Sequence, residues 1–262
     1  MLPKILLLAI FASPLLAQAP FVTDDAEVAE HKHWHFEFNN EHDWLQPDAA
    51  PNLRQNTANF KVSYGLFRNI EVGFDNQLLS VYNAPNPQFP RTAFGYGDLD
   101  TSVKWKILPE RAGWQHVALA ASLNIEFPTG NKRLQLGSGV TDYYLNGIIQ
   151  KSLTETTALR LNGGYYFAGN TVTGVEGIKT AKGSVFTGSG SIVHNFTKKL
   201  DLGIEVVGAE ASNFNLGRGQ LQTQFGGNYN LRPSFSIDFG LIGGFYQSSP
   251  RVGPIIGFSK NF

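Results

Sequence analysis

Apolar and polar residues alternate along most of the chain with a period of two. Between Val117 and Phe127 every odd position is apolar, and the even positions are small or polar. Three further stretches repeat the pattern: 98–107, 220–231 and 235–245. Successive side chains of a β-strand point to opposite faces, so the pattern predicts strands with one apolar and one polar face. No comparable stretch has helical spacing, and we therefore expect an all-β chain with a single domain.

Strands of this kind can be placed along the whole chain. Most are near the roughly 9–11 residues that a tilted strand needs to cross a bilayer, whereas strands of soluble proteins usually have about 5–6 residues. The predicted strands are 34–41, 56–64, 70–82, 98–108, 117–127, 142–152, 158–168, 183–195, 200–209, 220–231, 235–245 and 252–262. Their number and length predict a single closed antiparallel transmembrane β-barrel of about 12 strands.

The connections between these strands alternate between long and short. The long ones include 42–55, 83–97, 128–141 and 169–182. Outer-membrane barrels have short periplasmic turns and long extracellular loops, so the alternation predicts that both chain ends lie on the periplasmic side. A soluble β-sandwich has no physical reason to sort its loops in this way.

Aromatic residues gather near the ends of the predicted strands. In a membrane barrel the apolar face points outward, and aromatic side chains form girdles at the two interfaces. The girdle candidates are Trp34, Tyr64, Trp105, Trp114, Tyr143, Tyr165, Phe167, Tyr229, Phe245 and Phe258. The alternative is that these residues fill the core of a soluble β protein.

Composition narrows the function classes. After the N-terminus no apolar run approaches the roughly 18 residues of a membrane-spanning helix, and the mean hydropathy is −0.15. The chain has no Cys, which excludes a disulfide scaffold and a thiolate metal site. Lys+Arg and Asp+Glu both number 21, so no basic excess points to nucleic acid. An aromatic content of 13% argues against a disordered chain.

The first residues resemble a secretory signal peptide. Lys4 is followed by a short apolar stretch, and Ala17-Gln18-Ala19 fits a small-residue cleavage site. We expect a cleaved segment 1–19, with cleavage after Ala17 or Ala19, and a barrel over 20–262. The alternative is a buried N-terminal helix. A secreted chain without cysteine fits a bacterial envelope.

The polar faces of the predicted strands give the candidate lumen residues. They comprise ten acids and four bases: Glu37, Lys61, Glu71, Asp75, Asp98, Asp100, Lys104, Lys106, Glu126, Asp142, Arg160, Asp201, Glu205 and Asp238. One hypothesis is a net acidic lumen that, when open, prefers cations or neutral solutes over anions. The alternative is that these charges pair across the lumen and hold the barrel closed.

Signals for metal binding and catalysis are weak. His31, His33 and His35 alternate, so on an extended strand they would share one face and could hold a metal. The alternative, which we favour, is that they are hydrated residues near the mouth of the barrel. A barrel-embedded hydrolase would need a nucleophile beside a base. Ser189 and Ser191 are the nearest nucleophiles to His194, but both lie an odd number of residues from it and belong to the opposite face of a regular strand. We expect no enzyme, no metal site and no cofactor.

Several short segments resemble an outer-membrane transporter family named for the meta-pathway of phenol degradation. These segments are PFVTDDA at 20–26, GYGDL at 95–99, FPTG at 127–130, LGSGVTD at 136–142 and GFSKNF at 257–262. They correspond to the family's Thr-Asp-Asp motif, its Gly-x-Gly-Asp strand entry, its Pro-Thr-Gly strand end with the following Gly-Ser-Gly loop, and its terminal aromatic strand. Lys260 departs from this pattern because it falls in the apolar register of the last strand.

The resemblance implies an outer-membrane channel for small solutes, with hydrophobic or aromatic compounds suggested by the family label. It also implies that the barrel-assembly machinery recognises the last strand through Phe262. The expected partners are therefore outer-membrane lipid, this machinery and a small-molecule solute, without nucleic acid. Two alternatives remain: a closed barrel with a structural or surface-binding role carried by its long loops, and the hydrolase.

Overall fold

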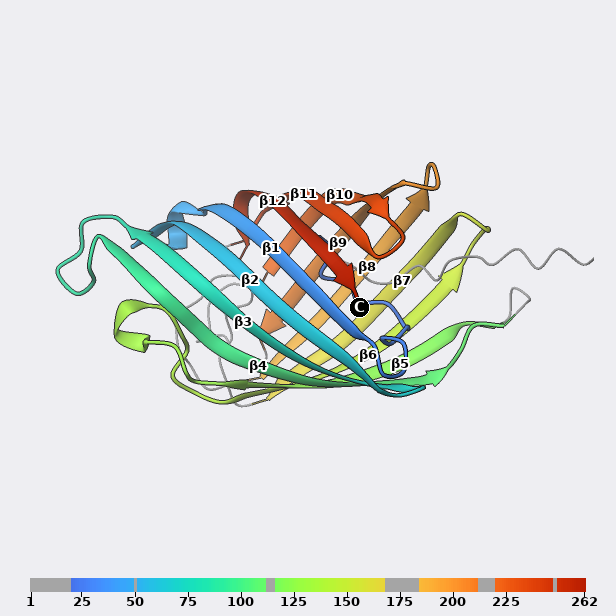
Figure 1. Cartoon of the computed structure of the whole chain (residues 1–262). Helices are drawn as coiled ribbons and strands as arrows, with labels where there is room; N and C mark the ends of the chain where they lie inside the picture. Colours follow the sequence, from blue (N-terminus) through green and yellow to red (C-terminus); the bar gives the residue numbers. More distant parts are fainter. Residues whose placement is uncertain (1–19, 50, 112–115, 168–183, 212–219, 247–248) are drawn as a thin grey trace, which may run out of the picture.

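The chain folds into a closed barrel of antiparallel strands (Figure 1). The computed structural model describes residues 20–49, 51–111, 116–167, 184–211, 220–246 and 249–262. Its strands are β1 (Trp34–Leu45), β2 (Asn52–Phe67), β3 (Ile70–Asn83), β4 (Thr92–Leu108), β5 (Ala118–Phe127), β6 (Asp142–Ser152), β7 (Thr157–Phe167), β8 (Ser184–Asn195), β9 (Leu200–Ala211), β10 (Gln220–Arg232), β11 (Phe235–Gly244) and β12 (Pro250–Asn261). Two short 3-10 helices, η1 (Pro47–Ala49) and η2 (Lys132–Leu134), lie in connections.

Each strand pairs with its neighbours in sequence, and β12 pairs with β1 from His35↔Asn261 to Leu45↔Pro250. The predicted closed antiparallel barrel of twelve strands is therefore confirmed. Closure leaves no free sheet edge, which is the condition under which strands can cross a membrane. No helix within the described residues is long and apolar enough to span a membrane.

The strands near the N-terminus extend beyond their predicted bounds. β1 continues to Leu45, and β2 and β4 are the longest strands, with 16 and 17 residues. The connections predicted over 42–55 and 83–97 therefore shorten to 46–51 and 84–91. In β1 and β2 many of the added residues are polar, as at Asp43 and Gln55, and in β4 glycines alternate with the exposed Phe94 and Tyr96. Polar residues and glycines weaken the apolar alternation without interrupting the backbone ladder, and the sequence pattern missed these strand ends for this reason.

The two ends of the barrel differ in their connections. We call "turn end" the end where β1 begins, which has the tight connections 68–69, 153–156, 196–199 and 233–234. We call "loop end" the opposite end, where 46–51, 84–91 and 128–141 connect strands. The predicted asymmetry is present, and the chain enters β1 and leaves β12 at the turn end (Figure 1).

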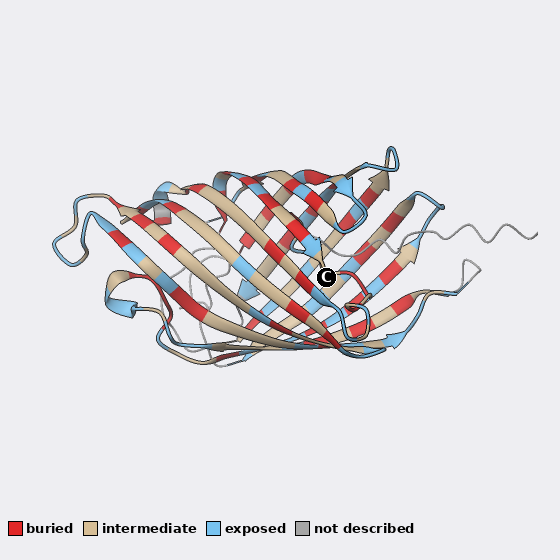
Figure 2. Ribbon diagram, viewed as in Figure 1, coloured by how far each residue is buried: buried red, intermediate tan, exposed pale blue. Residues whose placement is uncertain are grey.

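The outer face is apolar and the inner face polar. Ile192, Ile204, Phe225 and Leu241 form one cross-strand row over β8 to β11, and Ile204 and Phe225 are 53% and 56% exposed. The adjacent inward position Glu205 is 1% exposed. Figure 2 shows the resulting alternation of buried and exposed residues along the strands. The aromatic side chains therefore do not fill a central core.

Aromatic pairs lie toward both ends of the outer face, as girdles require. At the turn end the rings of Trp34 and Tyr64 are 4.6 Å apart, and toward the loop end the rings of Tyr165 and Phe186 are 4.6 Å apart. Of the girdle candidates, Trp114 lies outside the described residues.

We expect Ile204→Arg to destabilise the barrel in lipid bilayers by about 2–4 kcal/mol, because arginine on the lipid face near mid-strand loses its hydration. Urea unfolding in phospholipid vesicles, followed by tryptophan fluorescence, measures this change. Thr154→Arg is the control, since Thr154 is exposed in a turn. Equal midpoints for the two variants would show that the apolar face does not contact lipid.

Candidate functional site

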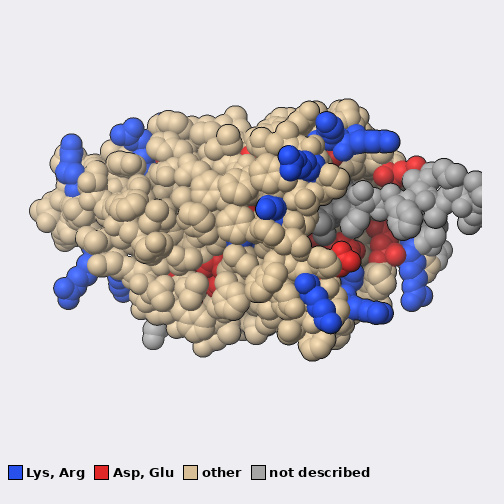
Figure 3. Space-filling view, viewed as in Figure 1, with Lys and Arg blue, Asp and Glu red and all other residues tan. Residues whose placement is uncertain are grey.

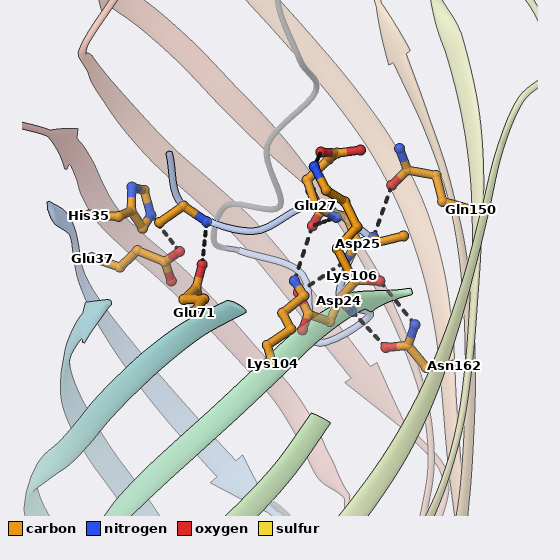
Figure 4. Close-up of polar contacts among 12 residues, drawn as sticks. Asp24, Asp25, Glu27, His35, Glu37, Glu71, Lys104, Lys106, Gln150 and Asn162 are labelled. Carbon is orange, nitrogen blue, oxygen red and sulfur yellow. Dashed lines mark hydrogen bonds and ion pairs between the residues drawn. The ribbon is translucent and has the colours of Figure 1, made fainter. Parts of the chain in front are cut away.

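The lumen contains the chain's own N-terminal segment, residues 20–33, which precedes β1. This segment crosses the lumen at the turn-end half and touches both sides of the wall (Figure 4). Pro20 and Thr23 contact β10 and β9, whereas Lys32 donates its backbone N–H to Gly65 O of β2 (2.8 Å). The segment has no apolar periodicity, so no pattern in the sequence predicted its position.

Glu205 on β9 holds the start of the segment. Its carboxylate accepts hydrogen bonds from the backbone N–H of Val22 (2.9 Å) and Thr23 (2.8 Å) and from the Thr23 hydroxyl (2.7 Å). Gln224 on β10 donates to the Pro20 carbonyl at 2.6 Å. Charge-assisted bonds at a buried carboxylate are stronger than neutral ones, so this end of the segment is firmly attached.

Lys104 on β4 holds the middle of the segment. Its Nζ donates to Asp24 Oδ1 at 2.8 Å and to Asp25 Oδ1 at 3.2 Å. Asn162 on β7 accepts from the Asp24 N–H (2.7 Å) and donates to the Asp24 carbonyl (2.9 Å). Burial raises the pKa of Asp25 above its usual value, against the opposing effect of Lys104 and Arg160.

Further contacts continue toward β1. Lys106 on β4 forms an ion pair with Glu27 at 2.9 Å, and Glu71 on β3 accepts the N–H of Ala29 at 2.6 Å. The wall makes room for the backbone at Gly65. A Cβ there would lie 2.1 Å from the Glu30 carbonyl oxygen, so only glycine permits this approach.

We expect Asn162→Leu to loosen the segment locally, because the change removes both hydrogen bonds to the Asp24 backbone and leaves its polar groups unpaired. Hydrogen exchange of the peptide covering residues 22–26 should become at least tenfold faster. Asn146→Leu, also inward-facing on β6, is the control. Unchanged exchange in Asn162→Leu would mean that the segment is held by other contacts.

Beyond the segment lies a cavity of about 470 Å³. Phe21, Val22 and Asp24 of the segment form part of its lining, so the segment closes it on one side. The wall contributes polar and charged side chains from several strands, namely Glu37, Glu41, Lys61, Glu71, Asp75, Gln77, Asp100, Ser102, Lys104, Ser122, Asn124, Glu126, Asp142 and Asn146.

One side of the cavity is acidic. Asp75, Asp100, Glu126 and Asp142 are direct cross-strand neighbours on β3, β4, β5 and β6. Within this set, Asp75 accepts a hydrogen bond from Asn59 Nδ2 at 3.1 Å. We call these four residues the acidic row.

The part of the cavity wall next to the acidic row is aromatic. The rings of Tyr144 and Tyr166 stack with centroids 4.2 Å apart, and the Tyr144 hydroxyl lies 2.9 Å from the Thr187 hydroxyl. Val207 and Ile242 add apolar surface to the lining. The cavity therefore offers both negative charge and an aromatic surface, a combination that the list of charged positions did not include.

All fourteen predicted lumen positions lie on the inner face, but they divide into groups. Each of the four bases lies near an acid. Lys61 is 3.6 Å from Glu37, and Lys104 and Lys106 form ion pairs with the segment. The buried Arg160 interacts electrostatically with Asp25 and Glu205. Charges pair around the segment, as the second alternative describes for part of the lumen. The acidic row lines the cavity, and the preference for cations stays a prediction.

The remaining predicted acids bind neighbouring polar groups. Asp98 accepts from the backbone N–H of Gly130 (2.8 Å) and Ser138 (2.7 Å), which fixes the 128–141 connection to the wall. Asp238 accepts from Asn228, Ser236 and Ser259, and Asp201 accepts from Asn195 and Asn230. These three carboxylates support structure rather than line the cavity.

The histidine triplet does not share one face. Lys32 adopts a left-handed backbone conformation with φ of 67°, so the chain bends before β1 begins at Trp34. His35 points inward with Nε2 2.8 Å from Glu37 Oε1, whereas His33 is exposed. Among the described residues no group of His, Cys, Asp or Glu has a metal-binding arrangement.

The hydrolase residues lie on opposite faces. His194 occupies an outward register position, where its Nδ1 lies 2.8 Å from the Thr157 hydroxyl. Ser189 and Ser191 occupy inward positions on the same strand. A nucleophile and its base must be within hydrogen-bond reach, so Ser189 and Ser191 form no dyad with His194, in agreement with the odd spacing in the sequence.

Sequence reasoning missed several lumen residues. Asp24, Asp25 and Glu27 precede the first strand, and the pattern gave no reason to place them in the lumen. Their one signal is charge: three acids in four residues could complement the inward bases Lys104 and Lys106. Neutral amides, which hold much of the segment, carry no comparable signal.

Comparisons with known proteins give the fold. No family model matches the chain, and no curated protein matches it. The COG4313 outer membrane channel from Pseudomonas putida F1 is similar in structure, with 14% identity and a TM-score of 0.71, over 91% of this chain and 98% of that chain. The KdgM porin, solved with disordered oligogalacturonate, has 10% identity and a TM-score of 0.57 over 87% and 99%.

The CymD monoaromatic hydrocarbon channel has 10% identity and a TM-score of 0.51, over 90% of each chain. These three proteins are described as channels or porins. At such identities the likeness shows the fold, which is that of an outer-membrane β-barrel.

Proposed function

We propose that this chain is a passive outer-membrane channel for small solutes. The observation that carries the proposal is a closed barrel with an apolar outer face around a charged cavity of about 470 Å³. An apolar exterior fits lipid, and the turn end then faces the periplasm. The fold shared with outer-membrane channels supports the same assignment.

The solutes that fit the cavity are small aromatic compounds, neutral or positively charged. The stacked pair Tyr144–Tyr166 offers an aromatic surface. The acidic row disfavours anions, because an anion entering the cavity would be repelled by several carboxylates at once. CymD is described as a monoaromatic hydrocarbon channel, and the resemblance to the phenol-degradation family points the same way.

The N-terminal segment controls passage through this lumen. It closes the cavity on the turn-end side and is held mainly by hydrogen bonds and ion pairs. Its apolar contact is small, with Ala26 buried in a cluster with three wall residues, Ala118, Ala120 and Ile148. Hydrogen bonds and ion pairs can exchange with water, so the segment restricts passage without being a permanent part of the wall. A closed structural or surface-binding barrel is the alternative.

Targeting and assembly belong to the same proposal. Cleavage after Ala17 or Ala19 would leave Pro20 near the new N-terminus, in agreement with the position of Pro20 inside the lumen. The last strand closes the barrel against β1, and Phe262 donates its N–H to Trp34 O at 2.9 Å. Recognition of this strand by the barrel-assembly machinery would therefore act on the strand that completes the fold.

Planar bilayers test the proposal directly. Purified barrel should give discrete current steps, and liposomes containing it should take up a small aromatic amine faster than empty liposomes. Absence of both conductance and uptake would favour the closed-barrel alternative. Uptake of an aromatic carboxylate faster than the amine of equal size would contradict the proposed charge preference.

A further inference from the structure

Charge is sorted between the inside and the outside of the barrel. Among the residues whose side chains the structure describes, the exposed acids are Glu30, Glu155 and Glu210, whereas many lysines and arginines are exposed. In the face seen in Figure 3, the basic side chains lie toward the two ends, and the band between them carries little charge. The outer surface therefore offers positive charge at the levels where lipid headgroups lie.

Lys260 on β12 is the unusual member of this set, because it occupies a lipid-facing register position. It pairs with Phe36 on one side and with Phe235 on the other, and both belong to the apolar face. Its Nζ lies 4.2 Å from the centroid of the Phe262 ring. A lysine placed among aromatic residues at the end of a strand buries its alkyl chain and directs its ammonium toward the interface.

A second cation lies beside it in the sheet. Arg232 at the end of β10 pairs with Phe235, so Arg232 and Lys260 flank this phenylalanine on the same face. Their backbones are two strand spacings apart, about 10 Å, which two long basic side chains can span to reach one anion. Both side chains are exposed, and neither has an ion pair among the described residues.

The surroundings of this pair are aromatic and free of competing acids. The rings of Phe235 and Phe36 each lie 5.8 Å from the Phe258 ring, which gives an apolar floor that can hold acyl chains. The described acids of β10, β11, β12 and β1 lie on the inner face: Glu37, Glu41, Asp43 and Asp238. The backbone carbonyl of Lys199, in the neighbouring turn, accepts the Asn230 N–H at 2.7 Å, and the Lys199 side chain adds positive charge nearby.

We infer that Arg232 and Lys260 form a binding site for the headgroup phosphate of an anionic phospholipid at the turn end of the barrel. The two cations bind the phosphate, and the phenylalanine floor contacts the acyl chains. The inference rests on the proposed membrane location but not on channel activity, since the site lies on the outer face.

Native mass spectrometry of the detergent-solubilised full barrel tests the inference with defined lipids. Phosphatidylglycerol should bind at least tenfold more tightly than phosphatidylcholine, and millimolar inorganic phosphate should not displace it. Arg232→Gln/Lys260→Gln should weaken the first phosphatidylglycerol at least tenfold. Arg68→Gln/Lys198→Gln is the matched control, because it removes two exposed turn-end charges that do not flank Phe235, and it should change binding less than twofold.

Equal weakening in both double variants would overturn the site, since binding would then follow total charge alone. Equal affinity for the two phospholipids would overturn it as well. Folding of each variant is checked by its heat-modifiable migration on gels. Conductance of wild type and variants is measured on the same preparations. A barrel that conducts but does not bind phosphatidylglycerol would contradict the lipid site and leave the channel proposal standing.

Discussion

Single-channel conductance of Lys104→Gln/Glu205→Gln should rise several-fold above that of the wild type. The two residues hold opposite ends of one stretch of the N-terminal segment, with Lys104 bound to Asp24 and Asp25, and Glu205 bound to Val22 and Thr23. Removing one partner of a buried ion pair costs about 3–5 kcal/mol. Hydrogen bonds to a charged group contribute about 1.5–3 kcal/mol each. The double variant therefore favours release of the segment from the lumen.

Lys151→Gln is the control for this experiment. It breaks an ion pair of similar length, 2.8 Å to Glu110, that lies near the turn end outside the cavity lining. Its conductance should equal that of the wild type. If the double variant folds, as judged by circular dichroism, and conducts like the control, then the segment does not limit the current.

Cation preference should fall sharply in Asp75→Asn/Asp100→Asn. The two carboxylates are cross-strand neighbours in the acidic row and line the cavity. Replacing them with isosteric amides removes negative charge while preserving the volume, so the electrostatic benefit of a cation in the cavity decreases. Reversal potentials in a tenfold KCl gradient measure the change, and the variant's potential should move toward zero.

Glu155→Gln provides the comparison, because Glu155 is an exposed acid in the turn 153–156. Its reversal potential should match the wild type. A wild-type barrel that prefers anions would contradict the assigned role of the acidic row. Repeating the measurement at high salt should weaken the preference, since salt screens fixed charges.

The fold could be predicted from sequence because one physical rule acts at nearly every position. A residue such as Leu123 must face lipid and its neighbour Asn124 must face the lumen. The alternation of apolar and polar residues therefore predicts the strands and their two faces. The rule gives a weaker signal where the inner positions are glycine or the strand is polar on both faces. The start of β4, where Gly95 lies between the exposed Phe94 and Tyr96, and the end of β1 around Asp43 are examples, and the predicted strands were too short there.

The candidate site was less predictable. Alternation identified inward charges such as Lys104 but not their partners, because pairing depends on register and on a segment outside the strands. The stacked Tyr144 and Tyr166 were missed since inward positions were selected by charge alone. The shared face considered for His31, His33 and His35 does not form, because the bend at Lys32 has no signal in the spacing of the histidines.

The anchors of the N-terminal segment also constrain the order in which the barrel folds. Val22 is hydrogen-bonded to Glu205, which lies 183 positions further along the chain, and Pro20 to Gln224, which lies 204 positions further along. Contacts of such long sequence separation form late, and these two require that β9 and β10 have already joined the sheet. A newly made barrel therefore passes through a stage in which nearly all of its wall exists while its first residues are still undocked, and any leakage during biogenesis belongs to that stage.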